Sequence, residues 1–246
     1  METIMKGWFS AKQRAHTAVL RDLLIQIYAR KPADLAFKGG TALAFFYGSD
    51  RFSKDIDFSS PNIEGYTVID DVLESFEKEY SYKILNAWED NIYETRSFRR
   101  YILTFGYGQF QDINVTIDYS IGKCALGLEN RELSNGYSAS SVSVMKPEEL
   151  LAEKVRALYS RQKARDLYDL HYLCAVLHTR ISLGAIAGKL AEDPSLKGVK
   201  YSFTSFKERI EGLRPFWGEL RELVANFEAL DFNDISTAAL SAFRNV

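Results

Sequence analysis

The chain has 246 residues, of which 46% are hydrophobic and 26% are charged, a composition typical of a globular protein with one large domain or two small ones. Its formal net charge of −2 excludes a protein that is basic overall, so any nucleic-acid-binding surface must be local. The two cysteines, Cys124 and Cys174, lie far apart and lack metal-type spacing, which argues against a disulfide framework or a zinc site. No segment approaches about 18 uninterrupted apolar residues, and the N-terminus has no apolar run of signal length. We therefore expect a cytoplasmic protein with no membrane contact.

The first predicted elements are a helix and a short strand that lead into a pair of glycines. Apolar residues recur every three or four positions from Ser10 to about Arg30, which predicts a helix with Ser10 as its cap. Leu35 to Phe37 then form a short buried strand. It leads into Gly39 and Gly40, where a turn is expected.

The two glycines predict a phosphate-binding turn. Gly39 and Gly40 have no side chains, so their backbone can approach a ligand closely. A short apolar helix beginning near Thr41 would point free N–H groups at that ligand. Thr41 itself either caps the helix or also touches phosphate.

A second strand, Asp55 to Ser59, carries two carboxylates on one face. Residues two apart in a strand project to the same side, so Asp55 and Asp57 point together while Ile56 and Phe58 face the core. Two adjacent anions are unfavourable unless a cation lies between them, and oxygen ligands favour Mg²⁺ or Mn²⁺. Because Mg²⁺ usually also binds substrate phosphates, the stretch predicts a site for a metal and a nucleoside triphosphate (NTP).

A helix and further strands follow this site. Helical spacing extends from Val68 to about Glu79, and strands rich in aromatic and β-branched residues are expected at Tyr82 to Trp88, Phe98 to Tyr107 and Ile113 to Tyr119. Alternation in the last of these places Asp118 on its polar face. A loop from 122 to 140 and a short strand from 142 to 145 complete this part.

Beyond residue 146 the pattern becomes entirely helical. We therefore expect an α+β protein with two domains, 1–145 and 146–246, in which a mixed sheet with flanking helices precedes an all-α C-terminal part. The stretch from Lys154 to Arg165 has five basic residues and no acid, a charge that suits a triphosphate. On a continuous helix, Arg161 and Arg165 would share one face and Asp166 would lie about 120° away from it. A helix break at 162–164 would remove this conflict.

These motifs resemble a known family. A Gly-Gly pair followed by Asp-apolar-Asp-apolar resembles the signature of the DNA polymerase β-like nucleotidyltransferases. The longer sequence segments KGGTAL and RFSKDIDF are similar to those of the AbiEii/AbiGii-type branch, which contains bacterial nucleotidyltransferase toxins and the related MenT toxins. The resemblance implies a polymerase β-like nucleotidyltransferase core and a C-terminal domain that completes the active site.

The resemblance also implies roles for individual residues. The segment EKVRALYSRQKARDLYDL matches the family segment that carries an essential lysine and aspartate, which makes Lys154 the nucleotide-binding lysine and Asp166 the later aspartate. Asp166 would orient Lys154 or Arg165, or bind substrate. Arg161 and Arg165 are expected to bind nucleotide. The third carboxylate of the metal site is assigned to Asp118, with Asp112 as the competitor.

The predicted function is metal-dependent transfer of a nucleoside monophosphate from an NTP to an acceptor hydroxyl. By the resemblance, the acceptor is a tRNA 3′ end, and the enzyme is the toxin of a bacterial toxin–antitoxin system that serves phage defence, with a cognate antitoxin as partner. One alternative is nucleotidylation of a protein or a small molecule. The other is a nucleotide-binding module without turnover.

Overall fold

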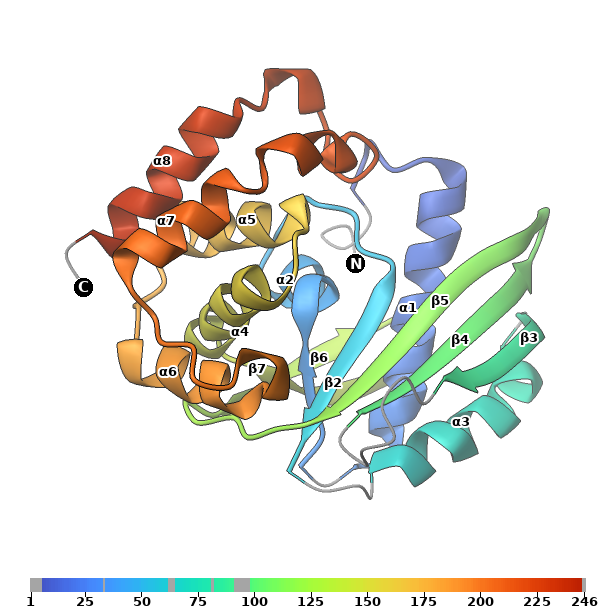
Figure 1. Cartoon of the computed structure of the whole chain (residues 1–246). Helices are drawn as coiled ribbons and strands as arrows, with labels where there is room; N and C mark the ends of the chain where they lie inside the picture. Colours follow the sequence, from blue (N-terminus) through green and yellow to red (C-terminus); the bar gives the residue numbers. More distant parts are fainter. Residues whose placement is uncertain (1–5, 33, 62–64, 81, 91–97, 245–246) are drawn as a thin grey trace. The chain divides into compact units, whose positions relative to one another are not determined.

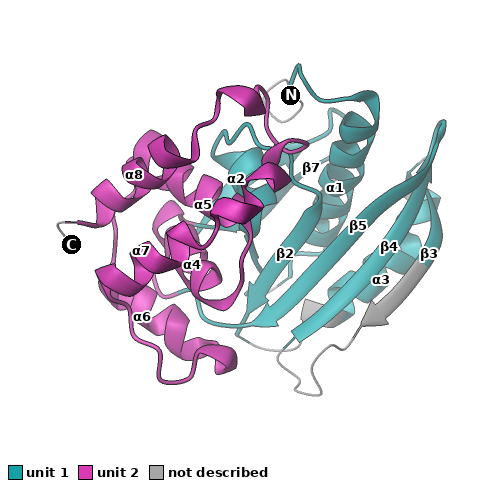
Figure 2. Ribbon diagram, turned by 45° about the horizontal axis from the view of Figure 1, so that its top comes forward, with its two compact units in different colours: residues 1–124, 128–145 teal, residues 125–127, 146–246 magenta. Residues whose placement is uncertain are grey.

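The computed structural model describes residues 6–32, 34–61, 65–80, 82–90 and 98–244. The chain divides into two compact units, which Figure 2 distinguishes by colour. Unit 1 comprises residues 1–124 and 128–145. Unit 2 comprises residues 125–127 and 146–246.

Unit 1 combines helices with one sheet. Its helices are α1 (Ala11–Ala29), α2 (Gly39–Phe46) and α3 (Gly65–Glu79). Its strands are β1 (Ala36–Lys38), β2 (Asp55–Ser60), β3 (Lys83–Asp90), β4 (Phe98–Tyr107), β5 (Phe110–Ile121), β6 (Leu128–Ser134) and β7 (Ala139–Met145).

The strands form a seven-stranded mixed sheet in the order β3-β4-β5-β2-β1-β7-β6. β2 pairs with β5 and β1 with β7 in parallel, whereas the other neighbours are antiparallel. This arrangement confirms the expected fold class, a mixed sheet with flanking helices.

One face of the sheet carries the hydrophobic core of unit 1. α1 packs along this face across β5 and β7, with α3 beside it (Figure 1). The inward-facing side chains of β2 and β5 are fully buried, as alternation predicts: Ile56, Phe58, Ile117 and Tyr119. The residues between them, including Asp55, Asp57 and Asp118, therefore lie on the opposite face.

A buried carboxylate ties α1 to two other segments of unit 1. Asp22 is 5% exposed and accepts hydrogen bonds from the Tyr82 hydroxyl at 3.1 Å and the Asn135 amide nitrogen at 3.0 Å. Asn135 in turn accepts the backbone N–H groups of Tyr137 and Ser138 in the β6–β7 turn. Asp22 thus holds the helix, the start of β3 and this hairpin together.

The predicted loop from 122 to 140 is wrong, because it contains β6. All seven residues of β6 pair with β7 in antiparallel register. β6 lies at the edge of the sheet, and its sequence LENRELS has only two apolar residues. An edge strand needs few inward-facing apolar residues, and charged side chains are common there, so alternation gave no strand signal.

Unit 2 is helical. Its α-helices are α4 (Pro147–Ser160), α5 (Ala164–His171), α6 (Leu183–Glu192), α7 (Phe203–Glu211) and α8 (Phe232–Phe243). A π-helical segment, η1 (Tyr172–Val176), continues α5, and short 3₁₀ turns occur at η2 (Pro194–Leu196), η3 (Arg214–Leu220) and η4 (Phe227–Ala229). The expected helix break is confirmed: α4 ends at Ser160 and α5 begins at Ala164.

A buried ion-pair network joins α4 to α6 within unit 2. Lys189 is 2% exposed, and its ammonium group lies 2.8 Å from Glu149 and 3.1 Å from Glu153. Arg156 continues the network by pairing with Glu153 and with Asp193. Burial alone would lower the pKa of Lys189, but the glutamates outweigh it and raise that pKa above its ordinary value.

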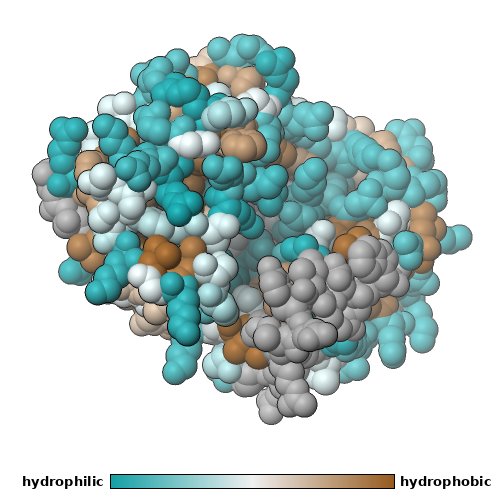
Figure 3. Space-filling view, in the orientation of Figure 1, coloured by the Kyte–Doolittle hydropathy of each residue, from teal (hydrophilic) through white to brown (hydrophobic). Residues whose placement is uncertain are grey.

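The surface is predominantly polar in the view of Figure 3, where hydrophobic side chains form small, separate groups. Among the described residues, no helix is both long and apolar enough to cross a membrane.

Replacement of Asp22 by alanine is expected to lower the free energy of unfolding by about 2 to 3 kcal/mol, because Tyr82 and Asn135 lose a buried acceptor. Chemical denaturation of both proteins measures the difference. Lys12→Ala is the control, since it removes an ion pair to Asp112 whose partners are about half and two-thirds exposed, and it should cost less than about 1 kcal/mol. Equal losses in the two variants would contradict the role given to Asp22.

Candidate active site

Four charged residues form a row across the polar face of the sheet in unit 1. The register places Lys38 of β1 beside Asp57 of β2, Asp57 beside Asp118 of β5, and Asp118 beside Arg100 of β4. Paired residues of neighbouring strands point to the same face, so two carboxylates lie side by side with a cation on either side.

Asp55 extends this row along β2. It is two residues before Asp57 and pairs with Thr116, so its side chain lies on the same face as both other carboxylates. Asp112, the competing third carboxylate, lies in β5 four residues before Thr116, and it forms an ion pair with Lys12 at an exposed position. The register therefore brings Asp118, and not Asp112, next to Asp57.

The two glycines lie against charged side chains of the same unit. α2 begins at Gly39 itself rather than near Thr41, and Gly39 has a φ of +80°. A Cβ atom on Gly39 would collide with the Asp57 carboxylate, and one on Gly40 with the Arg51 guanidinium. Gly39 is thus required because it combines a positive φ with the nearby Asp57 carboxylate, whereas a Cβ on Gly40 would displace the end of the Arg51 side chain, and the sequence did not show either contact.

The segment between α2 and β2 is held by buried polar groups. Thr41 is fully buried, and its hydroxyl lies 2.9 Å from the Ser53 hydroxyl and donates to the Asp55 carbonyl. The cap of α2 is Lys38, so Thr41 is not the helix cap. The His16 Nε2–H donates to the Lys54 carbonyl at 2.9 Å, and burial lowers the pKa of His16. These contacts hold the backbone carbonyls of Lys54 and Asp55 in place.

Arg100 binds Asp118 through two hydrogen bonds. Its Nε lies 2.6 Å from one Asp118 oxygen and its terminal nitrogen 2.7 Å from the other. The Arg100 guanidinium also lies over the Phe98 ring, 5.4 Å from its centroid. Asp118 is therefore held in a bidentate pair, the strongest common form of a charged hydrogen bond.

The three carboxylates on this sheet face offer the type of donor atom that a hard divalent cation prefers. Asp55, Asp57 and Asp118 supply only carboxylate oxygens, the ligands that Mg²⁺ and Mn²⁺ prefer. Among the described residues, no three acidic, histidine or cysteine side chains are grouped closely enough to hold a metal. Each oxygen of Asp118 accepts one hydrogen bond from Arg100 and keeps a second lone pair that could bind a cation.

A second cluster lies within unit 2 and is centred on Lys154. Its ammonium group is 2.9 Å from Asp166 and 2.7 Å from Asp169, and both aspartates are fully buried. Arg161 reaches the other oxygen of Asp166 at 2.8 Å. The break between α4 and α5 folds the two acids back onto the basic stretch, so the cluster has no net charge.

The environment of Asp166 keeps its carboxyl group ionised. Burial by itself raises the pKa of Asp166, but the positive charges of Lys154 and Arg161 and the hydrogen bonds that they donate hold that pKa well below its ordinary range. Asp166 thus orients Lys154 and Arg161 within this cluster. Arg165 lies half-buried in the first turn of α5.

Three residues with a place in the unit 1 site were not predicted from the sequence. Lys38 and Arg100 join the site only through the register of the sheet, which no local pattern encodes. Arg51 is 3% exposed and lies beside Gly40, and its position between the glycines and the carboxylates was the one available signal.

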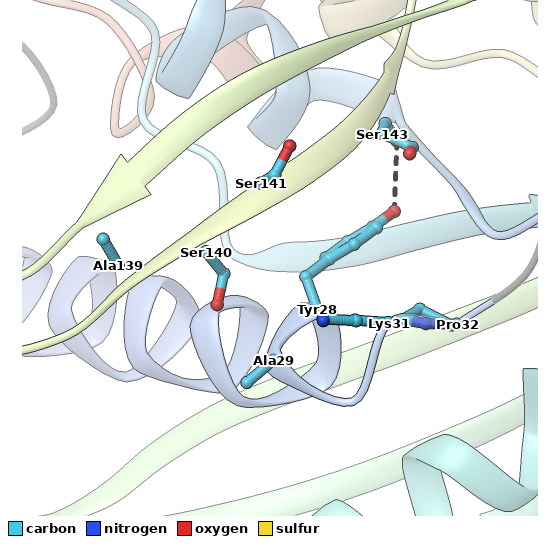
Figure 4. A pocket seen from close by; sticks show the side chains of 8 residues that line it. All are labelled: Tyr28, Ala29, Lys31, Pro32, Ala139, Ser140, Ser141 and Ser143. Carbon is cyan, nitrogen blue, oxygen red and sulfur yellow. Dashed lines mark hydrogen bonds between the residues drawn. The ribbon is translucent and has the colours of Figure 1, made fainter.

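A pocket of about 460 Å³ lies elsewhere in unit 1, between the end of α1 and β7. The Tyr28 hydroxyl points across it and donates to the Ser143 carbonyl (Figure 4). Its lining residues are Tyr28, Ala29, Lys31, Pro32, Ala139, Ser140, Ser141 and Ser143, none of which belongs to the charged row.

One family model matches residues 23–235, and its description is the nucleotidyl transferase AbiEii toxin of a type IV toxin–antitoxin system. This match spans most of the chain and includes both clusters. A search of curated proteins found no match to this sequence.

Solved structures share the fold at low sequence identity. A candidate nucleotidyltransferase from Helicobacter pylori superposes with a TM-score of 0.65 at 19% identity, over 95% of this chain and 94% of its own. JHP933 from Helicobacter pylori gives 0.65 at 18% identity, over 95% and 91%. MenT4, a nucleotidyltransferase toxin from Mycobacterium tuberculosis, gives 0.54 at 16% identity, over 95% of each chain.

Replacement of Gly39 by alanine is expected to lower the free energy of unfolding by about 2 to 4 kcal/mol, because a Cβ there meets the Asp57 carboxylate and the φ is left-handed. Gly198→Ala is the matched control, since Gly198 has a φ of +82° but open space around it. The control should cost about 1 to 2 kcal/mol. Urea denaturation compares the two, and equal losses would mean that Asp57 does not press against Gly39.

Replacement of Asp166 by asparagine is expected to lower the free energy of unfolding by about 3 kcal/mol at pH 7, because Lys154 and Arg161 lose a buried counter-charge. The folded pKa of Asp166 lies below the unfolded value of about 3.9, so its contribution is complete above about pH 5 and decreases as the pH falls below about 4.

Urea denaturation between pH 7 and pH 3 measures this difference between wild type and variant. The exposed Glu228→Gln serves as control and should show no comparable loss at pH 7. A difference for Asp166→Asn that stayed constant down to pH 3 would contradict the depressed pKa.

Proposed function

The chain belongs to the AbiEii nucleotidyltransferase toxin family, and on that premise we propose that it transfers a nucleoside monophosphate from an NTP to an acceptor hydroxyl in a metal-dependent reaction. The acceptor in this proposal is a tRNA 3′ end. The protein acts as the toxin of a type IV toxin–antitoxin pair, with a cognate antitoxin as partner. Both the family and the fold support a transferase.

The observation that carries the proposal is the adjacency of Asp57 and Asp118 on the polar face of the sheet, with Asp55 two residues away. In the proposed reaction the acceptor oxygen attacks the α-phosphorus, the bond to pyrophosphate breaks, and the hydroxyl proton passes to a carboxylate of this group. A bound divalent cation would stabilise the charge that develops on the phosphate oxygens. Asp55, Asp57 and Asp118 are the residues that would hold it.

Backbone N–H groups and a basic side chain of unit 1 would bind the phosphates of the nucleotide. The first turn of α2, at Gly39 and Gly40, offers backbone N–H groups, and the buried Arg51 offers a guanidinium beside them. These groups would bind phosphate oxygens and orient the triphosphate for attack. Thr41 is left out of this contact, because its hydroxyl bonds within the protein.

Residues of unit 2 enter the proposal through their sequence resemblance and their local geometry. Lys154 would bind nucleotide phosphate together with Arg161 and Arg165, and Asp166 would act as the residue that positions Lys154. The division into domains 1–145 and 146–246, with the second completing the active site, stays a prediction.

Two other functions follow from the same residues. Transfer to a protein or to a small-molecule hydroxyl uses the same carboxylates and differs only in the acceptor. A module that binds nucleotide without turnover would need neither the adjacent carboxylates nor their spacing, so the intact Asp55, Asp57 and Asp118 favour an enzyme.

Incubation of the purified protein with total tRNA, Mg²⁺ and each labelled NTP is expected to label RNA. Asp57→Asn and Asp118→Asn should abolish labelling with a melting temperature close to that of the wild type, because both side chains lie on a polar face. Asp112→Asn is the matched control in the same strand and should keep its activity. Label on a protein or a small molecule instead of RNA would overturn the acceptor, and no transfer to any acceptor would overturn the enzyme.

A further inference from the structure

The pocket beside the end of α1 lies where the sheet is incomplete. Among the described residues, β1 has three residues and pairs with β7 at one position, Phe37 with Val144. The stretch of β7 from Ala139 to Ser143 therefore has β6 on one side and, within the described ranges, no strand on the other. The pocket of about 460 Å³ lies on that open side, between β7 and the end of α1 (Figure 4).

The register shows which backbone groups of β7 face the pocket. The Ser143 carbonyl accepts the Tyr28 hydroxyl at 3.1 Å, so Ser143 directs its backbone groups away from β6 and toward α1. Alternate residues of a strand direct their N–H and C=O groups to the same side, and Ser141 therefore presents both groups to the pocket. An open strand edge of this kind is a template for pairing with another strand.

The side-chain hydroxyls around the pocket are already used within unit 1. The Ser140 hydroxyl donates to the Ile25 carbonyl at 2.8 Å, and the Ser143 hydroxyl donates to the Asn130 side chain at 2.9 Å. The Tyr28 hydroxyl donates to backbone carbonyls. The polar groups that remain for a ligand are thus mainly those of the β7 backbone. They suit an extended peptide better than a small molecule, which is usually oriented by a few polar side chains.

Among the described residues that line the pocket, Lys31 alone is charged. It is exposed, and its backbone φ is +50°, a left-handed conformation that glycine adopts more readily than lysine. The turn itself therefore does not favour lysine at this position. The ammonium group adds a positive charge to an otherwise neutral pocket and so favours a ligand with a carboxylate.

We propose that the open edge of β7 is a docking site for a partner protein, which adds an extended segment with an acidic side chain to the sheet as a short strand. The backbone of this segment pairs with Ser141, and its carboxylate faces Lys31. The edge from Ala139 to Ser143 is about 13 Å long, so a segment of about five residues covers it. The site takes a peptide and not a nucleotide, and it does not depend on the proposed function.

Fluorescence anisotropy of a labelled peptide, Thr-Val-Glu-Val-Thr with blocked ends, measures binding to the 246-residue chain. The wild type should bind it about two- to fivefold more tightly than the same peptide with glutamine in place of glutamate, the effect of an exposed ion pair. A version with every backbone N–H methylated should bind about tenfold more weakly, because it cannot donate to the Ser141 carbonyl. Equal binding of the methylated peptide, or no binding of any peptide at about 1 mM, overturns the inference.

Lys31→Gln tests the charge. This variant should bind the glutamate and glutamine peptides equally. Lys83→Gln is the matched control, since Lys83 is exposed in β3 at the far edge of the sheet, and it should keep the wild-type preference for glutamate. Loss of the preference in both variants would assign it to net charge and would overturn the contact with Lys31.

Ser141→Pro tests the strand edge. Proline removes the N–H group that faces the pocket and leaves the hydrogen bonds to β6 in place, because the Ser141 N–H points away from β6. The variant should bind the glutamate peptide about tenfold more weakly with a circular dichroism spectrum like that of the wild type. A folded variant that binds like the wild type overturns strand addition.

Sedimentation of the wild type and Ser141→Pro without peptide identifies the occupant. Both should sediment as the same species. A wild-type dimer that becomes a monomer in the variant would assign the edge to a second copy of the chain and would overturn the partner protein. If Ser141→Pro does not fold, the methylated and unmethylated peptides still decide between strand addition and its absence.

Discussion

The parallel register between β2 and β5 is the constraint on which the candidate site depends. Because Asp57 pairs with Asp118, two negative charges are held in neighbouring strands of the sheet, and their Cα atoms cannot separate without loss of backbone pairing. The neighbouring residues compensate the two negative charges or leave space for them. Lys38 and Arg100 flank the pair, and Gly39 yields the space that the Asp57 carboxylate occupies.

Unit 2 meets the same electrostatic requirement with the charges reversed. There a basic stretch is turned back on itself at the break between α4 and α5, and Asp166 and Asp169 enclose the Lys154 ammonium. A buried cation between two buried anions is stable only as a set, because removal of one member leaves the others without compensation. In unit 2 a functional candidate is thus part of a fully buried ion pair, so stability and activity will be coupled at Asp166.

Membership of the AbiEii family and the shared fold agree with this chemistry. The fold provides a polar sheet face with adjacent carboxylates and a glycine-led helix beside them, which suits transfer of a nucleotide between oxygen atoms. The three solved structures named above are 16 to 19% identical to this chain, so the likeness concerns the fold, whereas acceptor and nucleotide specificity depend on side chains that such identity does not specify.

The sequence by itself determined the local patterns: the alternation that separates Asp55 and Asp57 from Ile56 and Phe58, the helical period of α1, and the interruption between α4 and α5. It missed β6, because an edge strand carries little apolar alternation. Only the tertiary structure decided that Asp118 lies beside Asp57, that Arg100 binds it, and that Gly39 is required by Asp57. The physical reason is the sequence separation of the interacting residues. Hydrophobic periodicity and helix capping involve residues a few positions apart, whereas the strand register and ion pairs described here join residues 18 to 61 positions apart.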